Sequence, residues 1–210
     1  MDLISYLVKE GWLKTPCIIE AFKKIKRTDF IPNEMKGLSE INEPLPIGYG
    51  QTISQPLTVA FMLEQLQPEP GNKILDIGSG SGWTSALLAQ IVKNGKVIAL
   101  EILPELKEFG EKNVAKYNFV KKGIVKFFCL DATNGYINEA PYDRILVSAE
   151  VQKEIPLAWK EQLKINGRIV VPINNSVWTL IKKSDKDFKV IKYSGFSFVP
   201  LIHKDNIKDK

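Results

Sequence analysis

The chain has 210 residues, of which 44% are hydrophobic and 25% are charged, and its formal net charge at pH 7 is +5. These values suit a globular domain with a substantial buried core, and they argue against disorder except at the last few residues. No apolar run reaches the roughly 18 residues that span a bilayer. Because Met1-Asp2-Leu3 also lacks the basic start of a secretory signal, we expect a cytoplasmic protein with no membrane partner.

Two cysteines and one basic run bear on the partners that we expect. Cys17 and Cys129 lie far apart without metal-ligand spacing, so free thiols are favoured over a disulfide, and we expect no metal. Cys129 lies in the apolar stretch 125–130 and is predicted to be a core residue. The run Lys23-Lys24-Ile25-Lys26-Arg27 could contact nucleic acid, but acidic residues are interleaved with basic ones elsewhere. We therefore interpret the run as a solvated helix face and expect no nucleic-acid partner.

The first 55 residues combine helical patterns with a long irregular stretch. Apolar residues at helical spacing predict two helices within residues 2–27, the second beginning at Thr15-Pro16, and these helices could form a lid or a packing layer. Residues 28–55 have little regular pattern, and long irregular segments of this kind are often functional loops. A helix follows at Pro56, with Ser54 or Gln55 near its cap, and it turns these apolar residues inward: Val59, Met62, Leu63 and Leu66.

From Lys73 onward, strands and helices alternate. Strands are predicted at residues 73–77, 96–100, 124–129, 144–148 and 168–172, and helices at 83–92, 104–118 and 156–163. This order predicts a Rossmann-like, doubly wound α/β fold, with helices on both faces of a mostly parallel sheet. Residues 177–182 and 188–193 then form a C-terminal antiparallel hairpin. We expect a single domain, 1–210, made of N-terminal helices and a loop (1–55), an α/β core (56–172), and a hairpin with a tail (173–210).

A glycine-rich turn follows the first predicted core strand. The sequence Ile74-Leu75-Asp76-Ile77-Gly78-Ser79-Gly80-Ser81-Gly82 passes from strand character into glycines and then into a helical pattern, as at the nucleotide-type sites of α/β proteins. Trp83 stands where a dinucleotide fingerprint has its third glycine, which argues against NAD. An ordinary strand-to-helix turn without a ligand is the alternative interpretation.

Acidic residues at the ends of the strands indicate what the turn could bind. Glu101 ends the second core strand about 20 residues after the glycines, where a carboxylate can accept hydrogen bonds from ribose hydroxyls. Together with Asp76, it suits a cofactor that has a ribose but no phosphate, and S-adenosylmethionine fits this description. Asp131, at the end of the third strand, either holds the adenine amino group or is a turn aspartate.

Several segments resemble those of one enzyme family over nearly the whole chain. The most diagnostic is Pro44-Leu45-Pro46-Ile47-Gly48-Tyr49-Gly50-Gln51-Thr52-Ile53-Ser54-Gln55-Pro56, which we name the acceptor segment (residues 44–56). On this segment the chain resembles protein-L-isoaspartate O-methyltransferases. The resemblance extends to Arg27-Thr28-Asp29-Phe30-Ile31-Pro32, the glycine turn, Pro141-Tyr142-Asp143, Glu161-Gln162-Leu163, Asn166-Gly167-Arg168 and Phe198-Val199-Pro200-Leu201.

The resemblance implies a class I methyltransferase that modifies damaged proteins. Such an enzyme transfers the methyl group of S-adenosyl-L-methionine to the α-carboxylate of L-isoaspartyl residues, which starts their repair and leaves S-adenosyl-L-homocysteine. By position, Ser54 corresponds to the active-site serine of the family. The family's cofactor-lining positions correspond to Thr52, Ile53, Gln55, Gly78, Ser79, Gly80, Glu101, Asp131 and Ala132.

The chain departs from the family pattern at five positions. Glu40 and Asn42 stand where Tyr and Asp commonly precede Pro-Leu-Pro-Ile-Gly, and Asn166 and Ala132 stand at usual glycine positions. Glu150 replaces a small residue after the fourth strand. It is the most consequential departure, because a further anion near a carboxylate-binding site would repel the substrate unless it points outward.

The residue inventory fits methylation of a carboxylate without a general base. A carboxylate with a pKa of about 4 is already ionised at neutral pH, so positioning is the main requirement. We expect the Ser54 hydroxyl to orient the acceptor carboxylate, although it could instead cap the helix that follows. The only histidine, His203, is near the C-terminus and is interpreted as a surface residue.

Two functions of other classes remain open. A nucleic-acid methyltransferase that modifies amino groups would carry an Asn/Asp-Pro-Pro-aromatic motif after the fourth strand, but Ser148-Ala149-Glu150 occupies that place. A non-catalytic protein that binds the cofactor is conceivable because of Glu150 and Ala132. We expect a monomeric enzyme, with isoaspartyl-containing proteins and peptides as its partners.

Overall fold

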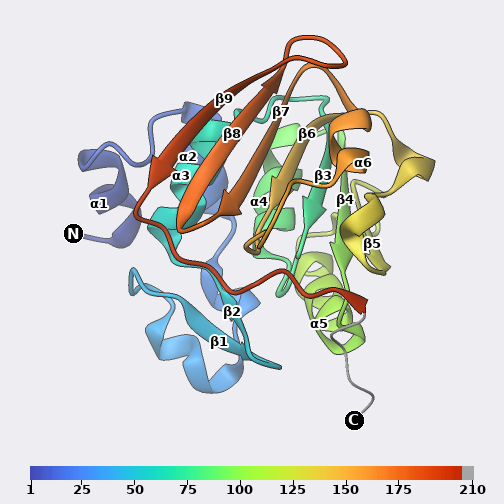
Figure 1. The fold of residues 1–210 in the computed structure, drawn as a ribbon. Coiled ribbons are helices and arrows are strands. Elements are labelled where there is room, and N and C mark those ends of the chain that lie inside the picture. The colour runs from blue at the N-terminus through green and yellow to red at the C-terminus, as the bar shows by residue number, and fades with distance from the viewer. Residues whose placement is uncertain (205–210) are drawn as a thin grey trace.

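A seven-stranded sheet runs through the molecule in the order β5-β4-β3-β6-β7-β8-β9 (Figure 1). The computed structural model describes residues 1–204. The first five of these strands are parallel, and β8 and β9 continue the sheet as an antiparallel hairpin. The strands are β3 (Lys73–Ile77), β4 (Lys96–Glu101), β5 (Val125–Cys129), β6 (Tyr142–Val147), β7 (Leu163–Ile173), β8 (Ser176–Lys182) and β9 (Phe188–Ser194). The predicted Rossmann-like α/β class is therefore confirmed.

The register of the parallel strands brings three turns to one edge of the sheet. Ile77 of β3 pairs with Leu100 of β4 on one side and with Val147 of β6 on the other. The residues that follow these three are Gly78, Glu101 and Ser148. In an open α/β sheet, ligands bind outside the carboxyl ends of the strands, so this edge is the expected place for a site.

Side chains that alternate along each strand build two hydrophobic clusters, one on each face of the sheet. On β3, Ile74 faces one cluster, whereas Leu75 and Ile77 face the other. The first cluster is covered by α1 (Leu3–Lys9), α2 (Pro16–Lys24), α3 (Pro56–Leu66), α4 (Trp83–Val92) and α5 (Pro104–Ala115). The second is covered by α6 (Leu157–Glu161) and the 3₁₀ turn η3 (Ala132–Asn134), and a further 3₁₀ turn, η4 (Ile137–Glu139), follows η3. Helical cover is thus present on both faces, as predicted, but it is much thicker on the first.

The two N-terminal helices form a packing layer. Leu7 of α1 and Ile18 of α2 are fully buried in the first cluster, and the Phe22 ring of α2 meets the Trp83 ring of α4 edge-on at 5.6 Å. Trp83, which replaces the third glycine of a dinucleotide fingerprint, therefore anchors α4 to the N-terminal layer. This contact connects the start of the chain to the end of the glycine turn.

The prediction that residues 28–55 have little regular structure is wrong in part. They contain two 3₁₀ turns, η1 (Arg27–Phe30) and η2 (Asn33–Leu38), and a short antiparallel hairpin of β1 (Leu45–Gly48) and β2 (Gln51–Ile53). Alternate residues of β1 are buried, but two prolines and two glycines obscure that period in the sequence. Figure 1 places the hairpin below the carboxyl ends of the strands.

Two predictions of burial are wrong. Cys129 is exposed because it ends β5, the edge strand of the sheet, which has only β4 as its neighbour. Arg27 ends the basic run that was interpreted as a solvated face, yet only 5% of it is exposed, because its guanidinium points under the acceptor segment. Element ends also shift: the predicted helix 156–163 is shorter, and the strand predicted at 168–172 begins at Leu163.

The segment after β9 crosses the carboxyl edge of the sheet (Figure 1). The carbonyl oxygen of Val199 accepts the N–H of Glu150 at 2.8 Å, and the N–H of Leu201 donates to the carbonyl of Glu150 at 2.8 Å. The N–H of Lys204 donates to Asp131 Oδ2 at 2.7 Å. Residues 205–210 of the predicted tail lie outside the described residues. Within residues 1–204, no helix combines the length and the apolar character that crossing a membrane requires.

Candidate cofactor and acceptor site

The glycine turn closes over the ends of β3 and β4. The N–H groups of Gly78 and Ser79 both donate to the carbonyl of Leu100, at 2.9 and 3.1 Å. Gly82 has a φ of 85° and approaches α5 so closely that an added Cβ would lie 2.7 Å from the carbonyl oxygen of Gly110. Only glycine fits this position, so the turn is held in one shape against α5.

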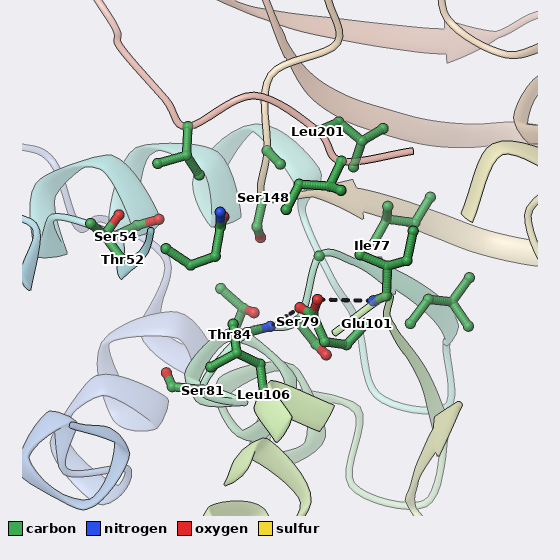
Figure 2. A pocket seen from close by; sticks show the side chains of 18 of the residues that line it. Thr52, Ser54, Ile77, Ser79, Ser81, Thr84, Glu101, Leu106, Ser148 and Leu201 are labelled. Carbon is green, nitrogen blue, oxygen red and sulfur yellow. Dashed lines mark hydrogen bonds between the residues drawn. The ribbon is translucent and has the colours of Figure 1, made fainter. Parts of the chain in front are cut away.

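Glu101 faces the turn and is held by backbone donors. Its Oε2 accepts the N–H of Gly80 at 2.9 Å, and its Oε1 accepts the N–H of Ile102 at 2.9 Å (Figure 2). Its Oε1 also accepts the N–H of Leu103 at 3.1 Å. Burial raises the pKa of Glu101, and these three hydrogen bonds oppose the rise. Because a carboxylate offers about four lone-pair positions, one remains for a ligand hydroxyl.

Asp76 lies beneath the turn and is fully buried. Its Oδ2 accepts the hydroxyls of Thr84 and Ser85 at 2.9 and 2.6 Å, which ties β3 to the first turn of α4. Its side chain is not among those that line the adjoining cavity. The structure therefore separates the two carboxylates: Glu101 faces the cavity, and Asp76 braces its floor.

A cavity of about 750 Å³, its open mouth included, lies between the glycine turn, the acceptor segment and the C-terminal segment. Eight of the residues predicted from the sequence line it: Thr52, Ile53, Ser54, Gly78, Ser79, Gly80, Glu101 and Ala132. Sequence reasoning missed a further set of lining residues, which includes Ile47, Gln51, Ser81, Trp83, Thr84, Leu106, Leu130, Ser148 and Val199 to Ile202.

Asp131 is engaged elsewhere, since its side chain does not line the cavity. Its Oδ1 accepts the N–H and the hydroxyl of Thr133, and its Oδ2 accepts the N–H of Lys204. Burial would raise the pKa of Asp131, but these hydrogen bonds outweigh it and lower the pKa. His203 is half-buried rather than a free surface residue, with its Nδ1 3.1 Å from the Thr133 hydroxyl. The geometry matches the turn-aspartate alternative for Asp131.

A second cavity of about 730 Å³, also counted with its open mouth, adjoins the first. Thr52, Ser54, Ser148 and Val199 line both cavities, so they form the boundary between them, which we call the junction. Gln55 lines only the second cavity, contrary to its predicted place among the cofactor-lining residues. The remaining lining residues of the second cavity are Pro44, Thr58, Ser197 and Phe198.

Ser54 does not cap the helix that follows it. The N-cap residue of α3 is Gln55, and the N–H of Leu57 is accepted instead by Asn42 Oδ1 at 3.0 Å. The Ser54 hydroxyl is thus left at the junction, whereas the Ser54 carbonyl accepts Arg27 Nη2 at 3.3 Å. Asn42, a departure from the family pattern, takes the capping role.

The other departures lie away from the junction. Glu150 points toward the turn between β7 and β8, where its Oε1 accepts the N–H of Asn175 at 3.0 Å, and it lines neither cavity. Asn166 adopts a left-handed φ of 64°, which asparagine tolerates better than most residues. Ala132 lines the first cavity in place of glycine. Because Glu150 points outward, the repulsion that its charge could cause is absent from the acceptor side.

The first cavity fits a cofactor that contains a ribose and no phosphate. Glu101 keeps an acceptor position for a hydroxyl, and the Ser79 hydroxyl is buried without a partner among the described residues. An unpaired buried hydroxyl is costly unless a ligand satisfies it. Glu101 is the only charged lining residue, so the lining described here offers no cation for a pyrophosphate. Fold and site together define an S-adenosylmethionine-dependent methyltransferase.

Comparison with known proteins identifies the family within that class. The family model of protein-L-isoaspartate(D-aspartate) O-methyltransferase matches residues 1–206, and the chain belongs to this family. A protein-L-isoaspartate O-methyltransferase of Methanopyrus kandleri is 38% identical, with 99% of this chain and 92% of the other covered. That of Thermococcus onnurineus is 39% identical, with 98% and 94% covered.

Two solved structures share the fold. A Plasmodium falciparum protein, described as a protein-L-isoaspartate O-methyltransferase in complex with S-adenosyl-L-homocysteine, superposes with a TM-score of 0.85 at 24% identity and covers 95% of this chain and 96% of its own. A second protein-L-isoaspartate O-methyltransferase also has a TM-score of 0.85, at 28% identity, and covers 94% of this chain and 64% of its own. Both matches cover at least 94% of this chain.

Proposed function

We propose that the chain methylates the α-carboxylate of L-isoaspartyl residues in damaged proteins and peptides, and that the transfer takes place at the junction of the two cavities. The observation that carries this proposal is the continuity of a cavity beside the glycine turn with one beside the acceptor segment. The first would hold S-adenosylmethionine through Glu101, Ser79 and Gly80, and the second would hold the acceptor. The family's curated members carry the same activity in their names.

The chain's own residues would act mainly by positioning. Bound S-adenosylmethionine supplies a methyl group on a sulfonium, whose sulfur takes the bonding electron pair when the carboxylate oxygen forms the new O–C bond. Ser54 would hold the acceptor carboxylate by donating its hydroxyl. Apolar lining residues such as Ile53 and Leu201 would exclude water from the methyl group. Holding reactants in line can contribute about 7–11 kcal/mol to a rate enhancement.

The second cavity does not favour a nucleic-acid substrate. Its lining residues, taken from the described part of the chain, include no lysine or arginine. Nucleic-acid binding depends on cations that neutralise phosphates, and a peptide carboxylate can instead be held by neutral donors. The second cavity therefore supports a peptide acceptor.

Replacing Ser54 with alanine tests the proposed role of its hydroxyl. We expect kcat with an isoaspartyl peptide to fall by about tenfold to a hundredfold, since a hydrogen bond to a charged group contributes about 1.5–3 kcal/mol. The dissociation constant for S-adenosyl-L-homocysteine, measured by calorimetry, should stay within about twofold. Ser184→Ala, at an exposed turn between β8 and β9, is the matched control. Unchanged turnover in the Ser54 variant would remove Ser54 from the mechanism.

We also propose that residues 1–210 form one domain that acts as a cytoplasmic monomer. One hydrophobic cluster joins Leu7 of α1 to Val177 of β8, which favours a single cooperative unit. The free thiols of Cys17 and Cys129 suit a reducing compartment. Light scattering should give the mass of one chain, and thermal unfolding should occur in one transition.

A further inference from the structure

Ser148 shares the junction with Ser54 but comes from a different element. It directly follows β6, and its N–H donates to the carbonyl of Ile77 at 2.9 Å, so its backbone is fixed to the end of β3. In Figure 2 its side chain extends down into the cavity, whereas Thr52 and Ser54 enter from the left. Because Ser148 lines both cavities, the two serines reach the same junction from separate parts of the fold.

The Ser148 hydroxyl is available to a ligand. Ser148 is half-buried, and within residues 1–204 only its backbone takes part in the hydrogen bonds of the chain. By contrast, two other hydroxyls that line these cavities are occupied: Thr84 donates to Asp76, and Thr58 donates to Gln55. A hydroxyl that reaches a cavity without a partner can donate to a bound acceptor without breaking an existing bond.

The charge of the junction defines what such a hydroxyl would bind. Of the described residues that line either cavity, only Glu101 is charged, and it lies beside the glycine turn. An acceptor carboxylate at the junction would therefore meet neutral donors instead of a lysine or arginine. A carboxylate has two oxygens, and both need hydrogen bonds when water is excluded. Ser54 supplies one hydroxyl, and the junction holds two more: Thr52 comes from the same segment as Ser54, whereas Ser148 comes from a separate element.

The backbone on either side of Ser148 is restrained. Ala149 packs against the glycine turn, with its Cβ 3.7 Å from the position that a Cβ on Gly78 would occupy. Glu150 is paired through its backbone with Val199 and Leu201 of the C-terminal segment. Ser148 thus lies between the glycine turn and the C-terminal segment that covers it. A small displacement of either one would move the Ser148 hydroxyl relative to the methyl donor.

We propose that Ser148 is a second catalytic residue, whose hydroxyl donates to the acceptor carboxylate from a different part of the fold than Ser54. This inference rests on the proposed function and deepens it by naming the second donor. One carboxylate oxygen attacks the methyl carbon while the two hydroxyls keep the carboxylate in line. The hydroxyl keeps its proton throughout, because the transfer neither consumes nor releases a proton.

The test compares Ser148→Ala and Ser148→Thr with the wild-type full chain. With an isoaspartyl peptide, Ser148→Ala should lower kcat by about tenfold to a hundredfold, and Ser148→Thr, which keeps the hydroxyl, should stay within about threefold. Calorimetry gives a readout that is independent of turnover. With S-adenosyl-L-homocysteine bound, the alanine variant should bind the peptide at least about fivefold more weakly, whereas its affinity for S-adenosyl-L-homocysteine should be unchanged. Ser184→Ala again serves as the control.

A double variant shows whether Ser54 and Ser148 bind the same carboxylate or affect turnover independently. If Ser54 and Ser148 hold the same group, the loss in Ser54→Ala/Ser148→Ala should be smaller than the product of the two single losses. Wild-type kcat in Ser148→Ala, or an equal loss of kcat in the alanine and threonine variants, would overturn the inference about Ser148 and leave the proposed function standing. A wild-type chain that forms no ester on the isoaspartyl peptide would instead reject the proposed function, and the inference with it.

Discussion

Asp76 has the most unusual environment of the titratable residues near the site. It is fully buried, its Oδ2 accepts two hydroxyls, and its Oδ1 has no partner among the described residues. Burial raises the pKa of Asp76 to about 6, although hydrogen bonds from Ser85 and Thr84 oppose the rise. An ionised carboxylate in this position is costly, and the two hydroxyls recover only part of the cost.

This pKa gives a pH dependence of stability with a definite sign. The usual pKa of an aspartate side chain is 3.8, so the folded chain holds the proton more tightly than the unfolded chain does. The contribution of Asp76 to stability is therefore complete below about pH 4 and is lost as the pH rises through about 6. A shift of about 2 pKa units corresponds to about 3 kcal/mol.

Asp76→Asn tests this account. Asparagine has the same shape and does not ionise, so the free energy of unfolding of the variant, minus that of the wild type, should rise by up to about 3 kcal/mol between pH 4 and pH 7. Denaturant unfolding at a series of pH values measures this difference. Residues that titrate equally in both proteins cancel. A difference that stays constant across the range would contradict the raised pKa.

At the scale of elements, Arg27 fastens residues 39–54, which include most of the acceptor segment, to the rest of the fold. Its guanidinium lies 5.6 Å from the centre of the Trp83 ring, at the start of α4. Burial lowers the pKa of Arg27 to about 10, so it stays charged at neutral pH. The position of the segment before α3 depends on this one guanidinium, which donates to four carbonyl oxygens of the segment. Four carbonyl oxygens accept its N–H groups, those of Ser39, Ile41, Glu43 and Ser54.

Arg27→Met should destabilise the protein and loosen this segment. The four carbonyls would lose their donor, and we expect the free energy of unfolding to fall by about 2–4 kcal/mol. Hydrogen exchange should accelerate in residues 39–54 more than in the strands. Lys23→Met removes an equal charge from an exposed position of the same basic run and should change stability little. Equal stability of the two variants would contradict the buried role of Arg27.

The sequence predicts regular elements well where apolar residues repeat without interruption. Strand 73–77 and helix 83–92 match β3 and α4 at both ends, because both elements are almost wholly buried and are not interrupted by proline or glycine. The β1–β2 hairpin was not predicted, since Pro44, Pro46 and three successive positive-φ residues, 48 to 50, hide its alternation. The prolines and glycines predict a turn in this part of the sequence, but whether β1 and β2 pair depends on the rest of the fold.

For the whole molecule, the site is assembled from three distant parts of the chain. Strand ends at Gly78, Glu101 and Ser148 provide one wall, and the acceptor segment provides another. The cover comes from Val199 to Ile202, which reaches the cavity through backbone hydrogen bonds with Glu150. Glycine spacing and resemblance could identify the first two parts. The resemblance also includes Phe198-Val199-Pro200-Leu201 from the third part, but no local pattern places this segment over the cavity, because its position depends on tertiary pairing.

The difference between local pattern and tertiary placement also explains which single site residues could be predicted from the sequence. Glu101 could be predicted to face a ligand because it ends a strand next to the glycine turn. Gln55 was assigned to the cofactor by position in the family, yet it lines the second cavity. Asp131 was assigned by its strand end and by the family, with a turn aspartate as the alternative, and it is occupied by Thr133 and Lys204. Which way a side chain turns at a strand end is decided by its neighbours in space.

The most direct test of the central claim is methyl transfer to matched peptides. The full chain is incubated with labelled S-adenosylmethionine and with two peptides that differ only in an aspartyl or an isoaspartyl linkage, and base-labile methyl ester is measured. The account predicts ester on the isoaspartyl peptide and none above background on the aspartyl peptide. Equal labelling of both peptides, or labelling of neither, would contradict it.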